Sequence, residues 1–178
     1  MIPEGGRAIE DRRSESERKE HAVHVAGHVV AVRLMGGEVL YASIEPFVSK
    51  EGIEAMGVTE VAETDYEGHD PRTKEGFDFW VRQSAIKMAG DVAQHIYRSE
   101  KQTSNYALSN LDQTMLELLY RKYSPIEDNM LLTQAKTLGT GIVRLKLEEH
   151  WNEVLAVAEE LTKGDLGEID SAEHEENE

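Results

Sequence analysis

Two histidines, His24 and His28, lie four residues apart in the apolar stretch "EHAVHVAGHVVAVRLMGG". In an α-helix, side chains at positions i and i+4 lie one above the other on the same face. Two imidazoles on one face can share a divalent metal ion, and zinc takes nitrogen ligands at about 2.0–2.1 Å. The spacing also fits two core histidines that bond to backbone groups, so other parts of the sequence must distinguish the two interpretations.

The residue after the first histidine is Val25, which has no ionisable atom. In hydrolytic H-E-x-x-H enzymes this position holds a Glu, which takes a proton from the attacking water and passes it to the leaving amine. Valine cannot do either step, so the sequence predicts that no intact catalytic set is present. His21, one turn earlier, is expected to be an exposed residue and not a third metal ligand.

The chain has 178 residues and no cysteine, a length typical of one domain with its own core. Without thiolates a metal must be held by His, Asp or Glu, and the lack of disulfides agrees with a cytoplasmic location. No segment approaches the roughly 20 apolar residues of a membrane span, and the N-terminus lacks the apolar core of a signal peptide. We therefore predict no membrane association.

Acidic residues outnumber basic ones by 35 to 19, which gives a formal net charge of −16. Such a charge repels nucleic-acid phosphates and anionic lipid surfaces, so neither is an expected partner. Part of the charge is local, because the last eleven residues, "EIDSAEHEENE", hold six carboxylates and no Lys or Arg. We predict a flexible N-terminal segment over residues 1–15, a single domain over 16–170 and a disordered acidic tail over 171–178.

The spacing of apolar residues predicts a mainly α protein of the α+β class, with a small β-sheet or hairpin. Ser14 and Glu17 form a predicted capping box that opens the first helix, and Gly36-Gly37 ends it. Strands are expected in "EVLYASIEP" and near Gly57-Val58-Thr59. Further helices are expected from Phe77, after "SNYALSN", over residues 126–138 with an interruption at Gly139-Thr140-Gly141, and from Leu147.

Four segments resemble, in the same order, the FtsH-type zinc peptidase domain. "VHVAGHVVAVRLMGG" resembles the family's A-x-H-E-A-G-H-A-x-V-A helix, and "IKMAGDVAQHIY" is similar to its L-A-G-R-A-A-E-E-I helix. "SNLDQTM" is similar to the S-N-D-L-E-Q-A-T segment that supplies an Asp as the third metal ligand. "LEEHWNEVLAVAEELTKGDLGEID" resembles the C-terminal helix of stand-alone members that lack the ATPase module. The resemblance spans residues 16–170 and implies a helical, zincin-like peptidase domain.

The resemblance implies a metal site formed by His24, His28 and a residue of "SNLDQTM". Two alignments compete for the third ligand: one places Asn110 there, and a shift of two residues places Asp112 there. We favour Asn110. An Asn carbonyl brings no negative charge and is a poorer zinc ligand than a carboxylate, so zinc is expected to be weakly held or absent. Both residues also fit the capping of a helix N-terminus.

These departures predict a domain that has lost proteolytic activity, because Val25 stands at the general-base position and Gln94 replaces a family glutamate. We expect a pseudo-peptidase that binds or regulates a protein or peptide partner, with homo-oligomers included among the partners. Two alternatives stay open. One is an active, ATP-independent zinc peptidase that uses another carboxylate, from residues 51–67, and the other is a metal-free structural subunit.

The small residues in two of these segments also predict how the helices pack. Ala26-Gly27 and Ala89-Gly90 permit close approach of two backbones, so we expect the histidine helix to pack against the helix that contains Ala89-Gly90. We further expect it to face the helix that begins near Asn110, with both histidines on the inner side.

Overall fold

The computed structural model describes residues 7–48, 52, 54–101, 110–125, 128–164 and 166. Its helices are α1 (Glu15–Leu34), α2 (Lys74–Glu100), α3 (Asn110–Tyr123), α4 (Asn129–Glu149) and α5 (Trp151–Lys163). Its strands are β1 (Arg7–Ala8), β2 (Val39–Ser43), β3 (Phe47–Val48), β4 (Glu54–Ala55) and β5 (Val58–Val61). The predicted mainly α class is confirmed.

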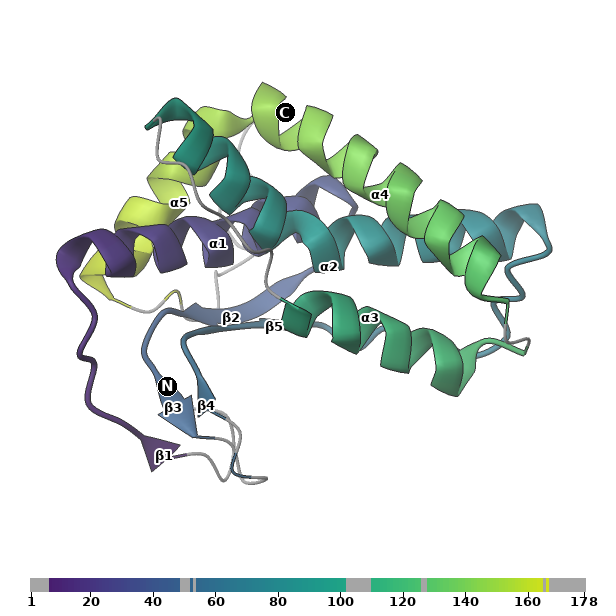
Figure 1. Cartoon of the computed structure of the whole chain (residues 1–178), viewed down its shortest axis with the longest axis horizontal. Helices are drawn as coiled ribbons and strands as arrows, with labels where there is room; N and C mark the ends of the chain where they lie inside the picture. The colour runs from purple at the N-terminus through teal and green to yellow at the C-terminus, as the bar shows by residue number, and fades with distance from the viewer. Residues whose placement is uncertain are drawn as a thin grey trace, which may run out of the picture.

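The strands form two small antiparallel sheets on one side of the helices (Figure 1). β2 pairs with β5, with Ala42 opposite Thr59, and the other sheet has the order β1-β3-β4. The strand predicted in "EVLYASIEP" and the strand predicted near Gly57 are therefore both present and are paired with each other. This β2–β5 hairpin lies below α1 in the view of Figure 1.

Helix α1 begins where the sequence predicts. The Ser14 hydroxyl accepts a hydrogen bond from the Glu17 backbone N–H, and the Glu17 carboxylate accepts one from the Ser14 backbone N–H at 2.7 Å. This reciprocal capping box satisfies two backbone donors that an open helix end would leave unpaired. The helix then becomes apolar on most sides, and nine of its residues between Ala22 and Val32 are buried.

Close approach between α1 and α2 depends on Gly27. A Cβ atom at this position would lie 2.5 Å from the Ala93 Cβ and 2.7 Å from the Ala89 carbonyl oxygen. Only a glycine therefore lets the two backbones come this near, and the packing predicted from Ala26-Gly27 and Ala89-Gly90 is confirmed.

The two glycines of α4 do not interrupt the helix, so the predicted break at Gly139-Thr140-Gly141 is wrong. α4 continues through them to Glu149, and the next helix begins only at Trp151, so Leu147 belongs to α4. A Cβ at Gly139 would lie 2.5 Å from the Val81 carbonyl oxygen of α2. Gly139 thus permits close helix packing, and the packing against α2 outweighs the low helix propensity of glycine.

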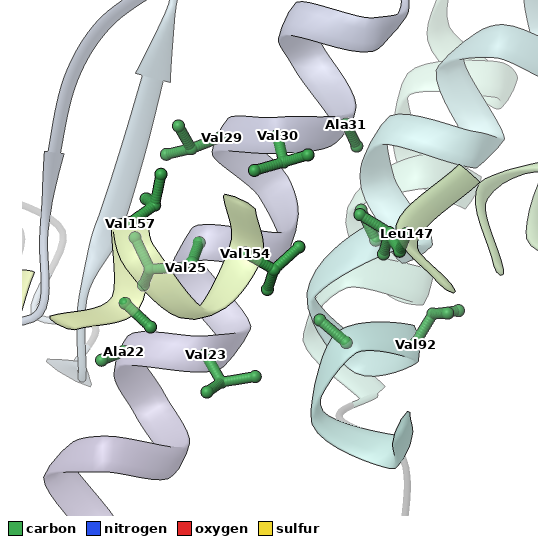
Figure 2. Close-up of a cluster of buried hydrophobic side chains, with 14 of the residues drawn as sticks. Ala22, Val23, Val25, Val29, Val30, Ala31, Val92, Leu147, Val154 and Val157 are labelled. Carbon is green, nitrogen blue, oxygen red and sulfur yellow. The ribbon is translucent and has the colours of Figure 1, made fainter. Parts of the chain in front are cut away.

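The main hydrophobic core lies between α1, α2, α4, α5 and the hairpin. Figure 2 shows part of it, in which Val154 and Val157 of α5 lie against the valines of α1. A second cluster, built on Trp80, Leu116 and Tyr120, fixes α3 to α2. α3 is thereby held with its N-terminal end towards α1, which is the arrangement that forms the site described next (Figure 1).

None of the helices within the described ranges is both long and apolar enough to cross a membrane. The acidic tail over 171–178 and part of the N-terminal segment lie outside the described residues.

Candidate metal centre

His24, His28 and Asp112 bring three ligand atoms together in a nearly equilateral triangle. The two Nε2 atoms lie 3.2 Å apart, and the Asp112 Oδ2 lies 3.2 Å from the His24 Nε2 and 3.3 Å from the His28 Nε2. Metal–ligand bonds of about 2.0–2.1 Å in tetrahedral geometry place neighbouring ligand atoms about 3.3–3.4 Å apart. The group can therefore hold a divalent metal ion, and no fourth His, Asp or Glu of the described ranges joins it.

Each ligand comes from an element whose packing is already fixed. The two histidines are on α1 and Asp112 is in the first turn of α3. Gly90 of α2 lies against the ligand nitrogens of the two histidines, since a Cβ there would be 2.5 Å from Nε2 of both rings. A side chain at this position would fill the space in which the ligand atoms converge, so the glycine keeps that space open.

The hydrogen bond of His28 on its other side determines which nitrogen faces the site. The His28 Nδ1 lies 2.9 Å from the Ile86 backbone carbonyl oxygen, which can only accept, so Nδ1 carries a hydrogen. In the neutral ring Nε2 is then a bare lone pair, and it faces the Asp112 carboxylate at 3.3 Å. A lone pair and a carboxylate at this distance repel each other unless a proton or a metal cation lies between them. Such an outer bond to a backbone carbonyl is typical of metal-binding histidines.

A buried carboxylate lies behind His24 in the same way. Asp91 of α2 is fully buried, and its Oδ1 lies 3.8 Å from the His24 Nδ1. This distance is longer than a hydrogen bond, so Asp91 is a polar neighbour of the ring on the side of Nδ1, away from the ligand atom Nε2.

Asp112 is poised to be ionised. Burial alone would raise the pKa of its carboxyl, but the His24 and His28 rings, when they carry a proton on the Nε2 atoms that face it, outweigh burial and hold the pKa well below its usual value. The third ligand is therefore a carboxylate at neutral pH and supplies the negative charge that favours a divalent cation.

The ligand atoms open onto a pocket of about 350 Å³ between α1, α2 and the β4–β5 segment. Its wall is largely apolar and includes Val25, Val32, Ala55, Val58, Val61 and Ile86. Its polar side chains besides the metal ligands include His21, Glu54, Lys87 and Gln94. A volume of this size is in the range of pockets that bind small molecules or short peptide segments.

Val25 lies between this pocket and the core. Its side chain is 5% exposed and belongs to the main hydrophobic cluster. One of its methyl carbons, Cγ2, would be 3.0 Å from a Cβ placed at Gly57, in the turn between β4 and β5. The residue next to His24 therefore presents a methyl group to the pocket, where a peptidase of the H-E-x-x-H type needs a carboxylate.

His21 was missed by the sequence reasoning, which expected an exposed side chain. It is partly buried and lines the same pocket, although it is not one of the three convergent ligands. Its Nδ1 lies 2.8 Å from the Glu17 backbone carbonyl, and desolvation lowers its pKa below the usual value. The ring is thus uncharged at neutral pH. Its spacing of three residues from His24, which places both on one helix face, was the available signal.

Of the two alternatives for the third ligand, Asp112 is the one that the structure brings to the histidines. Asn110 is the first residue of α3, and its side chain lies outside the described part of the chain. The expectation of weak zinc binding depended on a neutral amide in the third position, and that reason does not apply to a carboxylate.

A comparison with protein-family models finds no match to this chain, and no curated protein matches it.

Proposed function

We propose that this protein is a zinc-binding pseudo-peptidase with the architecture of the FtsH-type peptidase domain. In this proposal His24, His28 and Asp112 hold the metal, and the adjacent pocket holds a segment of a protein or peptide partner without cleaving it. Three features support the zinc site: the spacing of the ligand atoms, the Nε2 lone pair of His28 that faces the other ligands, and the space kept open by Gly90. Bound zinc would supply positive charge to polarise a carbonyl or attract an anion.

The observation that carries the loss of turnover is the methyl group of Val25 on the pocket wall. Peptide cleavage requires a group that accepts a proton from the attacking water and returns it to the leaving amine. The two imidazole nitrogens and the Asp112 oxygen face one another and would be occupied by the metal. Val25 provides no replacement at the position where the family has its glutamate.

A second candidate function rests on Glu54. This residue lies within the segment 51–67 from which a substitute carboxylate was expected, and it lines the same pocket. An active peptidase in which Glu54 takes the role of the missing general base is therefore the alternative that the structure favours next.

One experiment separates the functions. The purified wild type is loaded with zinc, its metal content is measured by elemental analysis after dialysis, and its cleavage of an unfolded protein is followed on gels. We expect stoichiometric zinc and no cleavage. Val25→Glu should introduce cleavage that a chelator abolishes, whereas Val25→Gln, which is equal in size but lacks the charge, should not.

Removing a general base typically lowers a rate by about 10²–10⁴-fold, so only cleavage by the wild type well above that residual level opposes the proposal. Loss of such cleavage in Glu54→Gln would establish the second candidate. Wild type without bound zinc would point instead to the metal-free structural subunit.

A further inference from the structure

The charges around the pocket are unusual for this protein. The whole chain carries a net charge of −16. A divalent ion held by two neutral imidazoles and one carboxylate keeps a net positive charge, and Lys87 adds a second cation on the pocket wall. Within the described ranges no carboxylate forms an ion pair with Lys87. The pocket would therefore be a positive spot on an acidic surface.

The groups that could cancel this charge are few. Among the described residues that line the pocket, Glu54 and Asp112 are the acidic ones, and Asp112 is a ligand of the proposed metal. His21 is uncharged at neutral pH, because desolvation lowers its pKa. The Asp91 carboxyl behind His24 is fully buried and does not line the pocket, so Glu54 is the one acidic side chain besides the ligand Asp112 among the described pocket residues.

The side chain at position 25 affects whether an anionic ligand can bind at the proposed metal. A Glu next to His24 would place a negative charge beside the metal and repel any anionic ligand, by Coulomb interaction in a partly dehydrated pocket. The valine removes that charge and replaces it by a methyl group. The same substitution that removes the proton acceptor thus makes the open position favourable for an anion.

From these observations we propose that the pocket binds an apolar carboxylate, with the carboxylate at the metal's open position and the apolar group against the wall formed by Val25, Val58, Val61 and Ile86. Two sources have this chemistry: the C-terminus of a peptide that ends in an apolar residue, and a free apolar carboxylic acid. This inference rests on the proposed zinc site and adds the chemical class of its ligand.

The test measures binding by isothermal titration calorimetry on the zinc-loaded full chain. The first pair of probes is N-acetyl-L-leucine and N-acetyl-L-leucinamide, which differ only in the terminal charge. We expect the acid to bind at least about tenfold more tightly than the amide, a difference of about 1.4 kcal/mol. Equal binding of the two probes would overturn the inference.

Substitutions at Val25 separate charge from shape. Val25→Glu should weaken binding of the acid by at least about tenfold more than it weakens binding of the amide, because both probes lose the apolar contact with Val25 but only the acid is repelled. Val25→Gln should weaken the acid by less than about threefold. Lys87→Gln should also weaken binding of the acid. Lys163→Gln, at the C-terminal end of α5, is the matched control and should leave binding of the acid unchanged. Equal effects of Val25→Glu and Val25→Gln on the acid would oppose the inference.

The two sources are distinguished by 4-methylpentanoate, which has the same apolar group and carboxylate but no peptide unit. Tighter binding of N-acetyl-L-leucine identifies a peptide C-terminus, and binding of equal strength identifies a free acid. Elemental analysis is run on the same sample. Bound zinc without a preference for the acid contradicts this inference alone, whereas absence of zinc contradicts the proposed function as well.

Discussion

The backbone of Gly90 in α2 faces the His24 ring so closely that a Cβ atom at Gly90 would lie 2.5 Å from the His24 Nε2, and equally close to the His28 Nε2. Helix interiors disfavour glycine relative to alanine by about 1 kcal/mol. Glycine at position 90 therefore lowers the stability of α2 locally. Its presence is explained by the space that the ligand atoms need. It also offers a way to damage the metal site without touching a ligand.

Gly90→Ala should lower zinc affinity by at least about tenfold, because the imidazoles must move away from the new methyl group. The fold should survive, since rings can shift more easily than backbone and alanine favours the helix. Thermal unfolding with and without zinc measures both effects. The wild type should be stabilised by zinc and the variant much less. Gly141→Ala is the matched control, because nothing lies within 4 Å of a Cβ at Gly141.

The identity of the third ligand gives a second prediction. Asp112→Ala should lower zinc affinity by at least about 100-fold, because changes to residues that only support a ligand already cost about 10–100-fold. Asn110→Ala should change it by less than about threefold. Competition with a fluorescent zinc chelator measures both. A larger effect of Asn110→Ala would mean that the alignment favoured from the sequence is the correct one.

The sequence predicted much of this arrangement, because the signals concerned are local. The capping box of Ser14 and Glu17, the inward pair His24 and His28, and the small residues around Gly27 all act within one helix or at one helix face. Their consequences follow from helix geometry without knowledge of the rest of the fold.

The choice between Asn110 and Asp112 was different. Two residues along a helix correspond to about half a turn, so the alternatives point to nearly opposite sides. Only the way α3 is fixed to α2, through Trp80, Leu116 and Tyr120, decides which side faces the histidines. The helix break predicted at Gly139 was wrong for a related reason. The role of Gly139 depends on its close approach to Val81, a residue distant in sequence.

Close packing of α1 on α2 gives a third prediction. Gly27→Ala would place a methyl group 2.7 Å from the Ala89 carbonyl oxygen, a backbone atom that cannot rotate away. We expect a loss of about 1–3 kcal/mol in the free energy of unfolding, as found for overpacked cores. Urea unfolding followed by circular dichroism measures it. Gly141→Ala should instead be neutral or stabilise by up to about 1 kcal/mol. Equal stability of the two variants would contradict the close approach.

The N-terminal segment gives the last prediction, which concerns pH. The Asp11 carboxylate accepts two hydrogen bonds from the Arg13 guanidinium at 2.8 Å, and Arg13 in turn donates to the Met56 carbonyl oxygen. The hydrogen bonds from Arg13 lower the pKa of Asp11 below its usual value. A carboxyl whose pKa is lowered in the folded state stabilises the protein above its unfolded pKa of about 3.9, and this contribution is lost as the pH falls towards the folded pKa. Asp11→Asn should therefore lower the free energy of unfolding by about 1.5–3 kcal/mol at pH 7, and this loss should shrink progressively below about pH 5.

Urea unfolding at pH 7, 5, 4 and 3 measures the difference. Glu10→Gln is the control, because its ion pair with Arg12 is exposed and should contribute less than about 1 kcal/mol at any pH. A cost of Asp11→Asn that stays constant across this range would show that the carboxylate charge does not hold the segment in place.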